Sequence, residues 1–146
     1  MGRLIYGWLL PLFLSVLMAA YWIGQTIPAQ RFAGHMRPVV TLMHVESVKA
    51  TVMDGMPSVV LSGTAEKLQD CTYRAIEWSL GGPYGVPVNA KFMDSPQVNG
   101  VGGLRWEALI VGITADRLFE TYGEVIHSCW GVTVRTPFYI GQGVTG

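Results

Sequence analysis

The sequence predicts one N-terminal transmembrane helix followed by a mainly-β, antiparallel domain of about seven strands, arranged as an immunoglobulin-like sandwich or a small barrel. Three observations predict this fold class. An uncharged apolar run occupies residues 4–23, apolar and polar residues alternate in short segments from residue 39 onward, and turns rich in glycine or proline separate those segments. The predicted divisions are a signal-anchor at 1–24, a juxtamembrane linker at 25–38, an extracytoplasmic β-domain at 39–140 and a flexible tail at 141–146.

The run from Leu4 to Ile23 has the length and composition of a membrane span. Its twenty residues would form a helix of about 30 Å, which matches the hydrocarbon thickness of a bilayer. No charged residue occurs between Arg3 and Arg31, and aromatic residues stand near both ends, as in the aromatic belts of membrane proteins. The residues predicted to contact lipid are Leu4, Trp8, Leu12, Leu17, Tyr21, Trp22 and Ile23.

A cleaved signal peptide is the alternative interpretation of the same run. Its cleavage end fits poorly, because cleavage after Ala20 would place Met18 where a small residue is needed. We therefore expect the segment to be retained as an anchor. Ser15 and Ala19 have the small-xxx-small spacing that lets two membrane helices approach closely, so a homodimer through them is one hypothesis.

Two cysteines, Cys71 and Cys129, indicate on which side of the membrane the domain lies. Outside the cytoplasm they would form one disulfide, whereas two free buried thiols are the alternative. Basic residues do not decide the orientation, because Arg3 flanks the run on one side and Arg31 and Arg37 on the other. The prediction is a single-pass protein of the inner cell membrane, with a cytoplasmic N-terminus and a periplasmic or extracellular domain.

The segment between the anchor and the domain is predicted to be a solvated spacer. It contains Pro28, Gly34 and Pro38, shows no hydrophobic period, and carries arginines that could rest on anionic headgroups. Beyond it, alternation between apolar and polar residues is clearest at 86–93 and 104–111. Strands are predicted at 39–53 (one or two), 58–67, 71–80, 86–93, 104–111, 124–130 and 132–139.

The segment 115–122 is predicted to be a short helix. Thr114 suits its N-cap, Asp116 suits the positive end of the helix dipole, and Gly123 suits the position just past its end. Its apolar side chains would share one face, and these are Leu118, Phe119 and Tyr122.

The order Cys71, Trp78, Cys129 resembles the cysteine–tryptophan–cysteine pattern of immunoglobulin domains, although only in part. Trp78 follows Cys71 too closely to sit on the next strand, and His127 stands where a tyrosine corner would have its tyrosine. The sandwich topology is therefore a hypothesis from strand count.

Candidate catalytic and metal-binding residues are few. His127 and Cys129 would lie on one face of a strand, but a catalytic dyad needs a free thiol and zinc needs four ligands. A carboxylate pair for glycoside hydrolysis could come from Glu77, Asp94 and Glu107, but nothing in the sequence distinguishes these residues from ordinary carboxylates on strand faces. We therefore predict no catalytic, cofactor or metal site, and since ten basic residues balance ten acidic ones, no nucleic-acid partner.

Two loops are the candidate binding sites, because loops on a rigid β-domain commonly carry recognition. One loop, 81–85, presents Tyr84, and the other, 94–103, presents Asp94, Gln97 and Asn99. The expected function is non-enzymatic: a membrane-anchored domain that binds another membrane or envelope protein, or serves as an accessory subunit, with the lipid bilayer as its other partner. The alternatives are a small bacterial or phage envelope protein for superinfection exclusion or lysis, and an envelope-polymer hydrolase.

Overall fold

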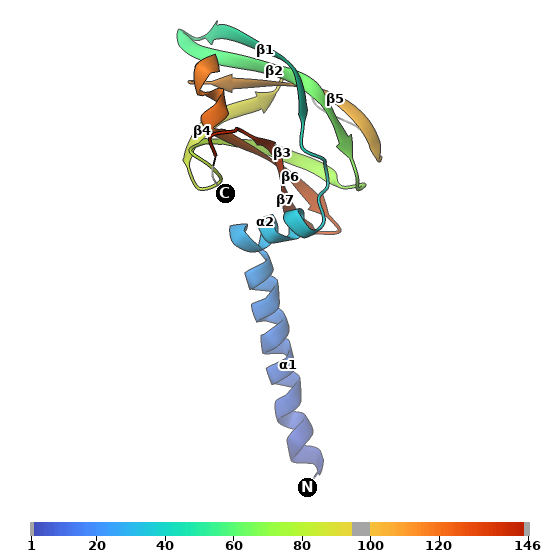
Figure 1. Cartoon of the computed structure of the whole chain (residues 1–146). Coiled ribbons are helices and arrows are strands. Elements are labelled where there is room, and N and C mark those ends of the chain that lie inside the picture. Colours follow the sequence, from blue (N-terminus) through green and yellow to red (C-terminus); the bar gives the residue numbers. More distant parts are fainter. Residues whose placement is uncertain (1, 95–99, 145–146) are drawn as a thin grey trace.

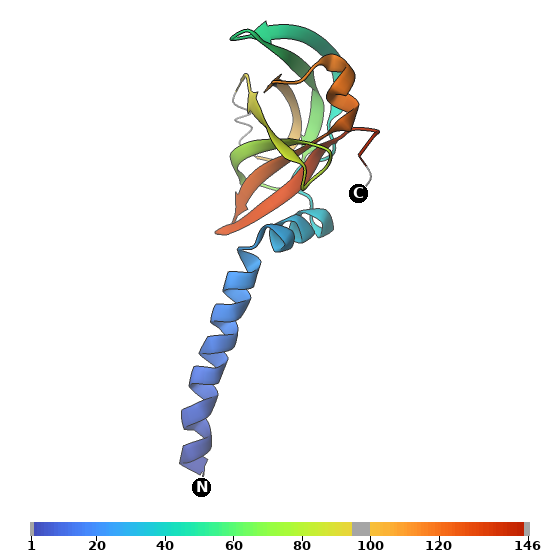
Figure 2. The same cartoon turned by 90° about the vertical axis from the view of Figure 1, so that its left-hand side faces the viewer.

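The computed structural model describes the backbone of residues 2–94 and 100–144, and side chains from Leu9 onward in those ranges. A long N-terminal helix and a short second helix precede a mainly antiparallel β-domain that stands at the end of the first helix (Figures 1 and 2). The elements are α1 (Gly2–Gly24), α2 (Ile27–Met36), β1 (His44–Met53), β2 (Met56–Lys67), β3 (Thr72–Leu80), β4 (Val86–Phe92), β5 (Gly102–Val111), the 3-10 helix η1 (Ala115–Glu120), β6 (Thr121–Cys129) and β7 (Val132–Ile140).

The seven strands form one continuous antiparallel sheet in the order β1-β2-β5-β4-β3-β6-β7. The predicted strand number and antiparallel class are therefore confirmed. The immunoglobulin-like sandwich is wrong, because β4 pairs with both β3 and β5 and so joins the two halves into a single sheet. Cys71 immediately precedes β3 and Cys129 is the last residue of the neighbouring strand β6, whereas the disulfide of an immunoglobulin domain joins two facing sheets.

The sheet curls strongly around one core. Three strands separate β5 from β7, which in a flat sheet would place them about 19 Å apart. The rings of Trp106 on β5 and Phe138 on β7 nevertheless meet with centroids 5.2 Å apart. The backbone N–H of Met43, just before β1, also donates to the carbonyl of Phe138, so the start of the domain reaches the last strand.

The core follows the predicted alternation with one exception. The inward residues of β5, which are Leu104, Trp106, Ala108 and Ile110, are all buried as expected. On β4, Val88, Ala90 and Phe92 pack against the core, but Val86 at the start of the strand is exposed. The other strands contribute further members to the same core, including Val59, Leu61, Ile76, Trp78, Val125 and Phe138.

The predicted linker at 25–38 is wrong in its central part, which forms α2. Thr26 occupies the N-cap position and Pro28 lies within the first helical turn, where its missing N–H costs nothing. The hydrophobic pattern is weak because the face of α2 that packs on β7 carries Gln30 and Gly34 rather than large apolar side chains. A helix that buries a polar face gives no apolar period to detect.

The predicted short helix is present but differs in type and length. It is a 3-10 helix ending at Glu120, and Tyr122 belongs to β6. Thr114 occupies the N-cap position without a side-chain capping bond, and Phe119 is exposed while Leu118 is buried. The first part of the predicted tail is hydrogen-bonded to this region, since the N–H groups of Gly141 and Gly143 donate to carbonyls of residues 121 and 119.

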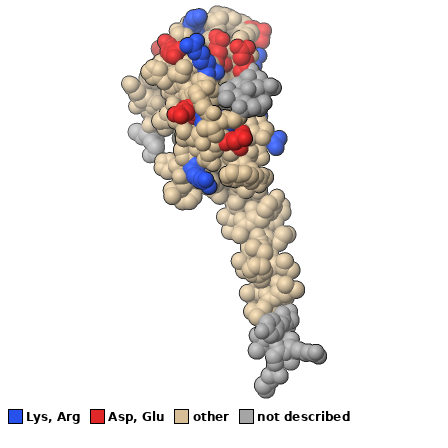
Figure 3. Space-filling model, turned by 90° about the vertical axis from the view of Figure 1, so that its right-hand side faces the viewer, with Lys and Arg blue, Asp and Glu red and all other residues tan. Residues whose placement is uncertain are grey.

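The length and hydropathy of the two helices can be compared with those of the predicted membrane span. Within the searched part of the chain, no single helix meets the length and hydropathy of a span, and only α2 together with residues 9–24 of α1 meets them, as a pair bent by 79°. Leu12, Leu17, Tyr21, Trp22 and Ile23 are all exposed on α1, whereas Leu4 and Trp8 lie outside the described side chains. Figure 3 shows no charged side chain on the described part of this stem, in contrast to the domain.

Candidate functional site

Two carboxylates lie directly opposite each other on the face of the sheet that packs against α2. Glu77 on β3 and Glu124 on β6 are register partners, and each lies beside core residues that point to the other face. Like charges in this arrangement repel, so the pair requires cations nearby. Arg31 from α2 and Arg135 from β7 supply them, and we call these four residues the Glu124 network.

Arg31 binds Glu124 through two of its guanidinium nitrogens. Its Nε donates to Oε2 at 2.9 Å and its Nη2 to Oε1 at 2.8 Å. The side chain of Glu124 is only 2% exposed and that of Arg31 18%, so the pair is shielded from water. The hydrogen bonds from Arg31 to Glu124 raise the pKa of the guanidinium against the opposing effect of burial. The Arg31 guanidinium therefore remains charged.

Arg135 joins the two carboxylates. Its Nη1 donates to Glu77 Oε2 at 2.6 Å and to Glu124 Oε1 at 2.8 Å. Burial opposes the charge of Arg135, but hydrogen bonds to both carboxylates outweigh it and raise the pKa. Its Nε donates to Gln30 Oε1 at 3.0 Å, which ties the network to α2 a second time. Two carboxylates and two guanidinium groups thus balance in charge.

Close backbone contact at Gly34 brings α2 near enough for these bonds. A Cβ at Gly34 would overlap the carbonyl of Arg135, so any larger residue would push α2 away from β7. The Glu124 network and this contact together fix the second helix on the sheet.

A cleft of about 400 Å³ opens beside the network, lined by Glu77, Trp78, Pro87 and Asn89 together with Arg31 and Glu124. Tyr84, the predicted binding residue of the 81–85 loop, stands next to Arg31, whose guanidinium carbon lies 4.6 Å from the centre of its ring. The carbonyl of Pro83 accepts a hydrogen bond from Arg31 Nη2 at 2.7 Å. The Tyr84 side chain is 77% exposed, so it is available to a partner.

Guanidinium groups occupy the oxygens of both carboxylates in the Glu124 network. Both oxygens of Glu124 and both of Glu77 accept hydrogen bonds from guanidinium groups. These hydrogen bonds join α2, β3, β6 and β7 through four charged side chains.

The other two candidate carboxylates are also brought together, on a second groove. Asp94 and Glu107 line an opening of about 250 Å³ with Glu46 and Arg105. Asp94 is exposed to solvent. Gln97 and Asn99, the other predicted residues of this loop, lie outside the described residues.

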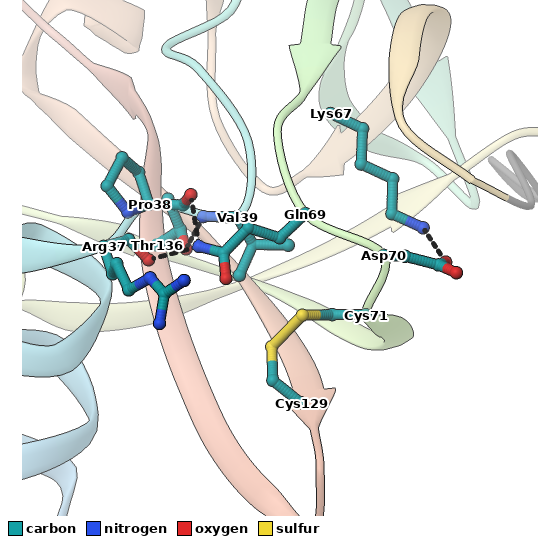
Figure 4. The surroundings of a disulfide bond; sticks show 9 residues. All are labelled: Arg37, Pro38, Val39, Lys67, Gln69, Asp70, Cys71, Cys129 and Thr136. Atoms are coloured by element: carbon teal, nitrogen blue, oxygen red, sulfur yellow. Dashed lines mark hydrogen bonds and ion pairs between the residues drawn. A yellow bond between two sulfur atoms is a disulfide. The ribbon is translucent and has the colours of Figure 1, made fainter.

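The predicted disulfide between Cys71 and Cys129 is present and anchors the chain that leaves α2 (Figure 4). Both cysteines are buried against Val39. The side-chain amide of Gln69 donates to the carbonyls of residues 37 and 38, each at 2.9 Å. The N–H of Val39 donates to the hydroxyl of Thr136. The residues that follow α2 are thus hydrogen-bonded to Gln69 and to Thr136 of β7.

His127 lies inside the curled sheet and not in a catalytic dyad. Cys129, which lies two residues further along β6, is in the disulfide, and His127 lines a small cavity of about 20 Å³ with Lys67 and Tyr73. Burial, with a smaller contribution from Lys67, lowers the pKa of His127 to about 4. Within the described part of the chain, no group of three or more His, Cys, Asp or Glu residues is placed to hold a metal ion.

Sequence reasoning did not find the Glu124 network, although one signal was present. Thr26 and Pro28 match the start of a helix, and that helix would have placed Arg31 on a defined face. Comparison of the chain with models of known families, with curated proteins and with solved structures finds no match. The fold and the Glu124 network are therefore the basis for assigning a function to this chain.

Proposed function

We propose that this chain is a non-enzymatic, single-pass membrane protein whose extracytoplasmic β-domain binds another membrane or envelope protein as an accessory subunit. The observation that carries the proposal is the docking of α2, the helix that directly follows α1, on the sheet through the Glu124 network and Gly34. A domain that only captures a soluble ligand works on a flexible tether, whereas a subunit of an assembly benefits from a set orientation to its anchor.

The anchor is α1. Its 23 residues would extend about 35 Å, enough for the hydrocarbon core of a bilayer. From Leu9 to Gly24 the helix carries no charge, and its large apolar side chains are exposed on all sides rather than packed on the domain. Lipid would cover a surface that is costly to leave in water. Tyr21 and Trp22 at the domain end suit the membrane–water boundary.

The disulfide supports placing the domain outside the cytoplasm. Disulfides form and persist in oxidising compartments and are rare in the cytosol. Cys71 and Cys129 are 58 residues apart in sequence, so their bond is structural rather than a local redox motif. With the domain outside, the N-terminus of α1 lies in the cytoplasm.

The surface that we assign to the partner is Tyr84 with the adjoining cleft. Exposed aromatic residues beside a defined hollow are common anchors of protein interfaces. Tyr84 packs on Arg31 of α2, the helix that directly follows α1. A partner embedded in the same membrane would meet this surface first.

The hydrolase alternative has weaker support. Glu77 and Glu124 are bound by guanidinium groups, and Asp94 and Glu107 line an open groove. A role in superinfection exclusion or in lysis would be a particular form of the accessory-subunit proposal.

The test combines extraction with affinity purification of the full chain through a C-terminal tag. We expect the protein to stay in the membrane during an alkaline carbonate wash and to bring a stoichiometric membrane partner through mild detergent. Tyr84→Ala should reduce recovery of that partner, whereas Val52→Ala, at an exposed site on β1, should not. Release by carbonate would contradict the anchor, and purification of the protein alone would contradict the accessory subunit.

A further inference from the structure

The outward face of α2 is apolar, which is the reverse of the usual arrangement. A helix on a soluble domain buries its apolar face and exposes its polar face. Here Gln30 and Arg31 face the sheet, while Phe32 is 67% exposed and Met36 is 68% exposed. Ile27, the first residue of α2, is exposed as well.

This apolar face points toward the side on which α1 lies. The sheet covers one side of α2, and α1 leaves from the other side at an angle of 79° to it (Figures 1 and 2). If α1 crosses the bilayer close to its normal, α2 lies nearly parallel to the membrane surface. Phe32 and Met36 are then continuous with the apolar surface of the anchor.

Trp130 extends the same surface from the β-domain. It occupies the turn between β6 and β7, which lies level with α2 in both views (Figures 1 and 2). Its side chain is 82% exposed, and the guanidinium carbon of Arg37, just past α2, lies 6.0 Å from the centre of one of its rings. Tryptophan with arginine is typical of the boundary between headgroups and acyl chains.

The charge distribution favours the same surface. The first acidic residue of the chain is Glu46, so neither α1 nor α2 carries a negative side chain. The arginines in and next to α2 are Arg31 and Arg37, and of these Arg31 is bound to Glu124. Arg37 remains on a surface without acidic neighbours in sequence, which suits anionic headgroups.

We propose that α2 is an interfacial helix that lays the β-domain on the membrane, with Phe32, Met36 and Trp130 inserted at the boundary of headgroups and acyl chains. The occupant of this surface is phospholipid. The inference rests on the proposed anchoring by α1 and adds a second contact, which would hold the domain, Tyr84 and the cleft at one height above the bilayer.

The test places an environment-sensitive fluorophore at single introduced cysteines in the full-length, oxidised protein, where the native cysteines are bonded to each other. Phe32→Cys and Met36→Cys report on α2, and Leu14→Cys reports on the anchor. Val52→Cys is the matched control, because Val52 is equally exposed at the far end of the domain. The protein is reconstituted in vesicles of phosphatidylcholine and phosphatidylglycerol, with nitroxide-labelled phospholipid or iodide as the quencher.

We expect labels at 32, 36 and 14 to emit at shorter wavelength than the label at 52, with strong quenching by lipid nitroxide. The label at 52 should be quenched by iodide only. A label at 32 that behaves like the label at 52, while position 14 is in lipid, would overturn the interfacial helix and leave the anchor intact. Iodide access at position 14 would instead overturn the anchor. Protection at 32 from both quenchers would overturn lipid as the occupant and indicate protein contact.

Discussion

Glu77 and Glu124 face each other across neighbouring strands, and one nitrogen of Arg135 donates to both. The repulsion between the carboxylates is therefore compensated inside the sheet, but only in part. The second positive charge comes from Arg31 on a separate helix. Docking of α2 thus completes an ion network that the β-domain alone leaves with an excess negative charge.

Loss of Arg31 should destabilise the protein markedly. Arg31→Met would leave Glu124, which is almost fully buried, with Arg135 alone, and removing one partner of a buried pair costs about 3–5 kcal/mol. Chemical unfolding of the detergent-solubilised full chain measures the effect. Arg117→Met is the control, because its pair with Glu120 is exposed and should contribute less than about 1 kcal/mol. Equal effects of the two substitutions would show that the Glu124 network has no structural role.

A side chain at position 34 should separate α2 from β7. In Gly34→Val the new atoms would overlap the carbonyl of Arg135, and such overpacking costs about 1–3 kcal/mol. Hydrogen exchange should show faster exchange of the α2 amides, with the sheet unchanged. Gly24→Ala should leave exchange unaltered, since a Cβ there meets nothing within 4 Å. Unchanged α2 protection in Gly34→Val would contradict the contact.

Removal of the disulfide should lower stability by about 4 kcal/mol for a loop of this length on the chain-entropy account. The change is Cys71→Ser with Cys129→Ser, which avoids a lone thiol. Thermal unfolding with and without reductant provides the readout. The parent protein should lose stability on reduction and the double variant should not respond, so a reductant-sensitive double variant would point to another cause.

Acidification should destabilise the fold through His127. Its pKa is about 4 in the folded protein and 6.5 in the unfolded chain, so the unfolded state binds more protons between these values. The contribution is present above pH 6.5 and is lost as the pH falls toward 4, by up to about 3 kcal/mol. His127→Gln removes the titrating group. Its unfolding free energy should depend less on pH in this window than that of the parent, and parallel profiles would exclude His127 as the cause.

Much of the β-domain was predictable because its signals are local. Leu104, Trp106, Ala108 and Ile110 alternate with polar neighbours, and side-chain direction in a strand repeats every two residues. The cysteine count and the compartment argument similarly predicted the disulfide. Asp54 and Gly55, the dipeptide between β1 and β2, both adopt positive φ, as Asp-Gly commonly does in a two-residue hairpin turn.

The strand number, the antiparallel class, the disulfide and the uncharged apolar segment at the N-terminus thus follow from local patterns in the sequence. The strand order, the curl of the sheet and the docking of α2 arise only when the chain folds. The physical reason is that these depend on pairs distant in the chain, such as Arg31 with Glu124, 93 residues apart. A buried polar contact leaves no periodic mark in a sequence, because its meaning comes from the partner that folding brings to it.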